Sequence, residues 1–360
     1  MRSAVEFVVA FYLFICVMLM VFNLLYMARS SIIARHREAR VRAWERVIRE
    51  DGANFVLDDA QVGKLKRIGN LTGFNAALAN LELDQDALNT FFLNNAHQIQ
   101  ELAIAYGGKS AMERAFMAYF IASFHCSSMP NRTMLAEILL SYLDDSTVFC
   151  RENVFQALNS LGSSQALEHA FEILNENRWY HSPKLISDGM ANFTGDKERL
   201  AKRLWNNHGH WQEPLNVATV QFASSLKSNC MDEPFMHALT HEETTLEVRF
   251  ALLRYFQHHP TDEARSILLK CLEDDNDLAI VAAAALGSYE GADVKEALKH
   301  TLRSRNWYVR HNSAQSLVRL GFTEDDRREI EQSGDRYALE MLEYVLARDA
   351  QSKAKRGNQA

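Results

Sequence analysis

Small or apolar residues recur with helical spacing along residues 97–349, in segments that return about every 32 residues. Aligned on Cys150, the other segments begin at Glu113, Ser182, Pro214, Val248, Leu278 and Val309. Four positions later come Met117, Val154, Ile186, Ala218, Leu252, Ala282 and Ser313, and eight positions later come Ile121, Leu158, Met190, Phe222, Phe256, Leu286 and Leu317. Residues with this spacing share one face of an α-helix. The pattern therefore predicts seven helices that each bury one face.

Two of these segments also match in sequence, which indicates an internal repeat. CRENVFQALNSLG (150–162) and VRHNSAQSLVRLG (309–321) share Arg, Asn, Gln, two Leu and Gly at equivalent positions. Further helical patterns, over 164–177, 261–274 and 292–305, lie between the aligned segments. A single helical hairpin cannot bury its apolar face, so neighbouring hairpins stack. We predict an all-α fold, with an α-solenoid of about seven helical hairpins over residues 97–349.

The pattern is weaker on both sides of this region. We interpret residues 51–96 as an N-terminal cap or irregular repeats, because the end repeats of solenoids are atypical. Residues 350–360 are polar and are predicted to form a flexible tail. Within the regular part, Thr261 and Asp293 are candidate N-caps of two first helices.

The repeat resembles the HEAT-repeat family, in particular the short variant seen in phycobilisome-lyase-like proteins. The family pattern is a Val-Arg pair, a small residue and a closing Leu-Gly. It is carried here by Val309-Arg310, Ser313-Ala314, Leu317 and Leu320-Gly321, and Val248-Arg249 repeats the pair. The resemblance implies stacked antiparallel helix pairs whose second helices line a concave face. It implies no particular chemistry.

Residues 4–27 form a continuous apolar segment that only Glu6 and Asn23 interrupt. As a helix with a rise of about 1.5 Å per residue, this segment crosses a hydrocarbon core of roughly 30 Å. A cleaved signal peptide is the alternative, but its apolar region is usually about 7–15 residues long. We therefore predict that residues 1–28 are a single-pass transmembrane anchor.

Basic residues follow this segment much more densely than they precede it. Arg2 stands before it, whereas Arg29, Arg35, Arg37, Arg40 and Arg42 come after it. The positive-inside bias then predicts an inner-membrane protein with its N-terminus outside and its body in the cytoplasm. Residues 29–50 have the pattern of a basic amphipathic helix. This helix either lies on anionic headgroups or carries the chain away from the bilayer.

The charge distribution bears on nucleic-acid binding. The net charge is −7, with +4 in residues 1–50 and hence −11 in the rest. HEAT-like alkylpurine DNA glycosylases present a basic groove, so no nucleic acid is expected here. Nucleic-acid binding stays open as a second alternative because Arg303, Arg305, Arg310 and Arg319 cluster in the last repeat.

No motif in the sequence specifies a reaction. HEAT-like deoxyhypusine hydroxylases use repeated His-Glu dipeptides as iron ligands, and this chain has one, His241-Glu242. The five cysteines are scattered without C-x-x-C spacing, which is typical of a reducing compartment. We therefore predict that the protein is not an enzyme, with no cofactor, metal or small-molecule substrate. The alternative is a lyase-like or metal-dependent enzyme that uses the concave groove.

The candidate partner-binding residues are aromatic pairs and arginines at the starts of second helices. Trp179-Tyr180 and Trp307-Tyr308 either pack one repeat on the next or anchor a partner, because Trp, Tyr and Arg dominate protein interfaces. Arg151, Arg249 and Arg310 are expected to pair with acidic or carbonyl groups of adjacent repeats, with partner contact as the alternative.

Together these features predict a membrane-anchored cytoplasmic scaffold that binds a protein partner, itself membrane-associated. Confinement to the membrane raises its effective concentration for such a partner. Single-span HEAT-like proteins resemble bacterial accessory proteins, so a glycosyltransferase or another envelope assembly is the client that analogy suggests.

Overall fold

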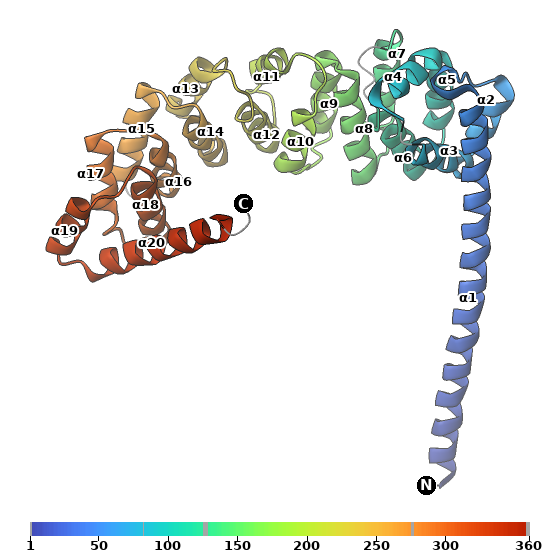
Figure 1. The fold of residues 1–360 in the computed structure, drawn as a ribbon, viewed down its shortest axis with the longest axis horizontal. Coiled ribbons are helices and arrows are strands. Elements are labelled where there is room, and N and C mark those ends of the chain that lie inside the picture. Colours follow the sequence, from blue (N-terminus) through green and yellow to red (C-terminus); the bar gives the residue numbers. More distant parts are fainter. Residues whose placement is uncertain (1, 82, 125–128, 275–276, 358–360) are drawn as a thin grey trace. The chain divides into compact units, whose positions relative to one another are not determined.

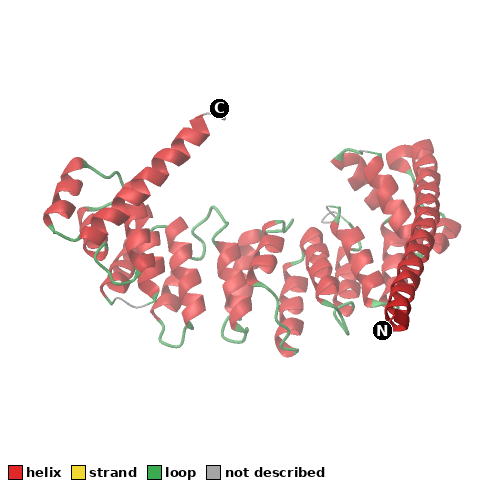
Figure 2. Ribbon diagram, turned by 90° about the horizontal axis from the view of Figure 1, so that it is seen from below, coloured by secondary structure: helices red, strands yellow, loops and turns green. Residues whose placement is uncertain are grey.

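A computed structural model describes residues 2–81, 83–124, 129–274 and 277–357, and within these ranges the chain is helical, without strands (Figure 2). This confirms the all-α class. The chain divides into two compact units, Met1–Ser163 and Ser164–Ala360. The boundary falls inside the region predicted as one array, and each unit is described by itself.

Unit 1 begins with α1, a helix of 50 residues, Arg2–Asp51, that is drawn in Figure 1 as one unbroken rod. The other elements of this unit are η1 (Gly52–Asn54), α2 (Asp59–Leu65), α3 (Ile68–Asn80), α4 (Gln85–Asn94), α5 (Ala96–Gly107), α6 (Ala111–Ala122), α7 (Arg132–Ser141) and α8 (Val148–Leu161). The last four form two hairpins, in which α5 packs on α7 and α6 packs on α8.

The end of α1 belongs to the folded body of unit 1. Trp44 and Ile48 are buried against α3, and the Trp44 ring meets Phe74 edge-on at 5.0 Å between centroids. Gly69 and Gly73 allow the close approach, because a Cβ added at either position would lie 3.2 Å from Arg40. The predicted amphipathic helix 29–50 is therefore exposed at its start and packed on protein at its end.

The segment predicted as a cap, 51–96, is organised by aromatic rings and one buried amide. Six phenylalanines contact one another there, on α6 and just after α6, namely Phe55, Phe74, Phe91, Phe92, Phe120 and Phe124. Asn95 is fully buried: its Oδ1 accepts from Leu57 N at 2.7 Å, and its Nδ2 donates to the Phe55 and Phe91 carbonyls at 2.8 Å. These bonds satisfy backbone groups that would otherwise be buried without partners.

Unit 2 consists of hairpins whose second helices contact each other in sequence order. Its helices are α9 (Ser164–Glu176), α10 (Pro183–Ala191), α11 (Lys197–Asn206), α12 (Glu213–Ala223), α13 (Asp232–Thr240), α14 (Leu246–His258), α15 (Asp262–Glu273), α16 (Leu278–Ala285), η3 (Leu286–Ser288), α17 (Ala292–Thr301), α18 (Trp307–Arg319), α19 (Glu324–Gln332) and α20 (Arg336–Gly357). Contacts run from α10 to α12, α14, α16, α18 and α20 in turn. The intervening helices run in the opposite direction, so the second helices α10, α12, α14, α16 and α18 all run in the same direction.

The predicted register is confirmed in both units. Each of the seven aligned segments begins at, or within two residues of, the first residue of a second helix, from α6 to α18. All fourteen predicted inward positions have relative exposures of 3% or less. The same spacing therefore identified both the helices and their buried faces.

The seam between α16 and α18 is partly polar, although the pattern predicted apolar packing. Asn312 Nδ2 donates to the Ile280 carbonyl at 2.7 Å, and Ser316 Oγ donates to the Ala283 carbonyl at 2.6 Å. Gly287 lies against Ser316, where an added Cβ would be 2.7 Å from Ser316 Oγ. Small side chains here allow the two backbones to approach closely.

Two local predictions are corrected. Thr261 caps α15 as expected, but Asp293 lies inside α17 and pairs with Arg265, while Gly291 occupies the N-cap position. At the C-terminus, α20 continues to Gly357, into the segment 350–360 that was predicted as a flexible tail.

We expect Gly287→Ala to destabilise unit 2 by about 1–3 kcal/mol, because the added methyl group overpacks the α16–α18 seam. The measurement is thermal unfolding of the full-length protein in detergent, with amide exchange to locate the loss in α16–α18. Gly209→Ala is the matched control, since nothing lies within 4 Å of its added Cβ. Equal stability of the two variants would contradict the close approach.

Candidate functional site

The first candidate site is the apolar part of α1. Among the described residues, the part of α1 from Ala10 to Glu50 is the one helical segment that is long and apolar enough to cross a membrane. The most apolar stretch of this segment is not buried in the protein. Large apolar side chains from Phe11 to Met27 point outward around the helix. Length and composition fit a membrane span, and a signal sequence near the N-terminus has the same character.

The arginines that were predicted to orient this span have different environments. Arg29, Arg35, Arg37 and Arg42 are exposed on α1, and Arg42 lies 4.0 Å from Glu38. Arg40 instead packs over Gly69 and Gly73 of α3. The side chain of Arg40 therefore also contributes to packing between α1 and the body, and its role in orienting the span stays a prediction.

The three candidate arginines of the second helices brace the loops that precede their own helices. Arg151 Nη1 donates to the Ser146 carbonyl at 2.9 Å, Arg249 Nη2 to the His241 carbonyl at 3.0 Å, and Arg310 Nη1 to the Ser304 carbonyl at 2.7 Å. The prediction of carbonyl partners is right, but these carbonyls belong to the same hairpin and not to an adjacent repeat. Contact with a partner protein stays a prediction for these residues.

The aromatic pairs differ from each other in burial. Trp179 is half-buried and Tyr180 is 70% exposed, in the loop before α10. Trp307 and Tyr308 form the first turn of α18 and are 47% and 62% exposed. A large aromatic surface therefore remains open to solvent at the start of α18.

Trp307 belongs to a cluster that joins α18 to α20. Its ring stacks on His311 one turn later, at 4.9 Å between centroids and 8° between planes. His311 in turn lies 6.0 Å from the Tyr344 ring of α20, which is 51% exposed. Burial lowers the pKa of His311, and the nearby Arg348 guanidinium lowers this pKa further.

Exposed apolar residues recur in the first turns of other second helices. In unit 2, Leu185 on α10 and Leu246 on α14 lie in the first turn and are about half exposed, like Trp307. We call Leu185, Leu246, Trp307 and Tyr308 the apolar edge of unit 2. In unit 1, Met112 on α6 and Val148 and Phe149 on α8 occupy equivalent positions and are also exposed. The sequence analysis did not identify these aliphatic members.

A hollow of about 530 Å³ lies between α18 and α20 and begins at Gln315, one turn of α18 after His311. Its walls are formed by Gln315, Val318, Arg319, Val345, Arg348, Asp349 and Lys353. We call this hollow, together with Trp307, His311 and Tyr344, the α18–α20 groove. It has an aromatic end and a cationic end.

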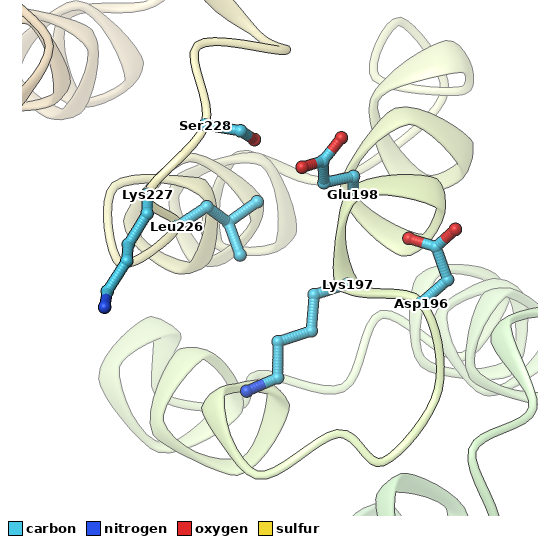
Figure 3. A pocket seen from close by; sticks show the side chains of 6 residues that line it. All are labelled: Asp196, Lys197, Glu198, Leu226, Lys227 and Ser228. Atoms are coloured by element: carbon cyan, nitrogen blue, oxygen red, sulfur yellow. The ribbon is translucent and has the colours of Figure 1, made fainter.

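A second hollow, of about 600 Å³, lies beside the start of α11 and the loop after α12 (Figure 3). Its polar groups already serve the fold: the Asp196 carboxylate caps α11 by accepting from Arg199 N, and Lys197 Nζ donates to the Ala191 carbonyl at 2.6 Å. This hollow therefore offers little unused chemistry.

Within the described ranges, no three His, Cys, Asp or Glu side chains gather as metal ligands would. His241 of the single His-Glu dipeptide lies 5.9 Å from the ring of His237, and its carbonyl accepts from Arg249.

No family model matches the sequence, and no curated protein matches it. Among solved structures, human deoxyhypusine hydroxylase in complex with glycerol matches with 14% identity over 87% of this chain and 97% of that chain. The TM-score of this match is 0.28.

The matched protein is a hydroxylase, and the prediction that this chain is not an enzyme is withdrawn. A TM-score of 0.28 carries no argument for a particular reaction, and none is assigned to this chain.

We expect Trp fluorescence to change as His311 becomes protonated below pH 6.5, its ordinary pKa. The folded-state pKa is the lower one, so the unfolded chain binds the proton more tightly. The stability linked to His311 is therefore complete above about pH 6.5 and is lost as the pH falls through the folded pKa.

The measurement is the difference in fluorescence between the wild type and His311→Gln across this pH range. Arg348→Gln should move the midpoint upward by removing a repelling charge. A midpoint at or above 6.5, or the same titration in His311→Gln, would contradict the stacked arrangement.

Proposed function

We propose that this protein is a membrane-anchored, HEAT-like repeat protein that binds a protein partner through its apolar edge. The observation that carries the proposal is the recurrence of half-exposed apolar side chains in the first turns of α10, α14 and α18. Residues that serve only the repeat core turn inward, whereas these residues repeat and turn outward. Large exposed apolar side chains that recur along a repeat array favour an interaction site.

The chemistry of this edge suits a protein more than a small molecule. Trp307 and Tyr308 combine large apolar area with polar edges, and such residues supply most of the binding energy in protein interfaces. The arginine-braced loops hold the same helix ends in place, since Arg249 and Arg310 fix the backbone before α14 and α18. A rigid, repeated edge lowers the entropy cost of binding.

The apolar part of α1 supports the membrane location. If the hydrocarbon core ends near Met27, residues 28–39 form an exposed helical stalk of about 18 Å before the helix reaches α3. The excess of arginine after the span supports a cytoplasmic body in the inner membrane. A partner in the same membrane would then meet the repeats at high effective concentration.

We expect Trp307→Ala to weaken partner binding by about 2 kcal/mol, or roughly 30-fold, as for an interface hot spot. Stability should change by about 0.5 kcal/mol or less, because the ring is half exposed. The measurement is crosslinking in intact membranes followed by mass spectrometry.

Tyr119→Ala is the control of the same kind, since Tyr119 is a similarly exposed aromatic residue on α6 that lies outside the edge. Crosslinks that survive in Trp307→Ala, or that disappear equally in Tyr119→Ala, would argue against the apolar edge.

The orientation of the protein in the inner membrane can be tested separately. Protease added to spheroplasts should leave the body after residue 50 intact, because the inner membrane shields it. Digestion of the body while the membrane is still sealed would overturn the cytoplasmic assignment, and recovery of a soluble, shortened chain would indicate a cleaved signal sequence.

A further inference from the structure

The α18–α20 groove differs from the rest of the apolar edge because it combines aromatic and cationic side chains. Trp307 and Tyr344 lie at one end, on either side of His311. Arg319, Arg348 and Lys353 lie at the other end, with Val318 and Val345 between them. Arg348 links the two ends: it lines the hollow, and its charge lowers the pKa of His311.

Basic side chains outnumber acidic side chains among the described residues that line the groove. Lys353 pairs with Asp349 at 2.7 Å, and Asp349 is the acidic side chain among the described residues that line the hollow. Arg319 and Arg348 are both exposed and add two guanidinium groups to this pair. A guanidinium group binds a carboxylate through two parallel hydrogen bonds, which favours carboxylate ligands here.

The dimensions of the groove suit a short peptide segment. Trp307 and Arg319 are twelve residues apart on α18, or about 18 Å along its axis. An extended chain covers that distance in about five residues, and a helix covers it in about twelve. The hollow of about 530 Å³ accommodates several side chains.

We propose that the α18–α20 groove binds an acidic segment of a partner protein, with an apolar or aromatic side chain against Trp307 and Tyr344 and carboxylates against Arg319 and Arg348. This proposal rests on the protein-binding function proposed above and specifies the chemistry of the partner. A nucleic acid fits less well, because residues 51–360 carry a net charge of −11 and would repel a phosphate backbone outside the groove.

The test uses the full-length protein in detergent micelles and an array of synthetic peptides of about fifteen residues. Each peptide has a Leu, Phe or Trp core, flanked by an increasing number of carboxylates or, in the matched set, of lysines. The same protein is offered labelled oligothymidine. Binding is measured at low and high salt for the wild type, Arg348→Glu, Arg348→Lys and Trp307→Ala.

Binding should increase with the number of carboxylates, require the apolar core and weaken at high salt. Arg348→Glu should reduce it at least tenfold, whereas Arg348→Lys, which keeps the charge, should stay within about threefold of the wild type. Trp307→Ala should reduce binding to the peptides with an aromatic core. Unchanged thermal unfolding of each variant excludes loss of the fold.

Three results would overturn the proposal: peptides that bind through lysines, binding that Arg348→Glu leaves unchanged, or oligothymidine that binds more tightly than every acidic peptide. If no peptide binds while Trp307→Ala still abolishes crosslinks in membranes, the groove assignment fails and the proposed function stands. If the crosslinks also persist in Trp307→Ala, both fail.

Discussion

The end of α1 packs against α3 where Gly69 and Gly73 leave room for Arg40, and Trp44 and Ile48 bury their side chains beside it. The rest of α1 continues outward from this contact without a break. An apolar helix that ended in a flexible linker would only tether a protein. Here the helix is part of the fold of unit 1, so its direction is fixed relative to that unit. The proposed anchor is for this reason also a support of defined length.

In unit 2 the corresponding constraint is the contact between successive second helices. Asn312 and Ser316 bond to the backbone of α16, and the absence of a side chain at Gly287 permits that approach. Each second helix uses its inward face for this contact, so its first turn and its outer face stay available for binding. The apolar edge lies on the first turns. The α18–α20 groove instead lies beside the contact between two second helices, where Trp307, His311 and Tyr344 also pack α18 against α20.

The periodicity of small and apolar residues predicted the helices and their buried faces because burial in a repeat fixes both at once. It did not predict the phenylalanine cluster around Phe74 or the buried Asn95, since those contacts join segments with no common period. The neighbours of Arg40 and Arg310 also depended on tertiary structure: the sequence did not predict that Arg40 packs over α3, and it predicted carbonyl partners for Arg310 in an adjacent repeat, whereas they lie in its own hairpin. Trp307 was recognised as a candidate from its pairing with Tyr308, whereas Leu246 lacked any local signal that distinguishes it from a core residue.

The account is tested most directly by a nitroxide scan of residues 20–50 in lipid bilayers, with accessibility measured to oxygen and to a water-soluble nickel complex. It predicts high oxygen accessibility up to about residue 27 and nickel accessibility on every face from 28 to 39. From residue 40 onward, accessibility should follow a helical period, with minima at Trp44 and Ile48. An oxygen-accessible face that persists through residues 28–39 would place this helix on the bilayer surface and contradict the account.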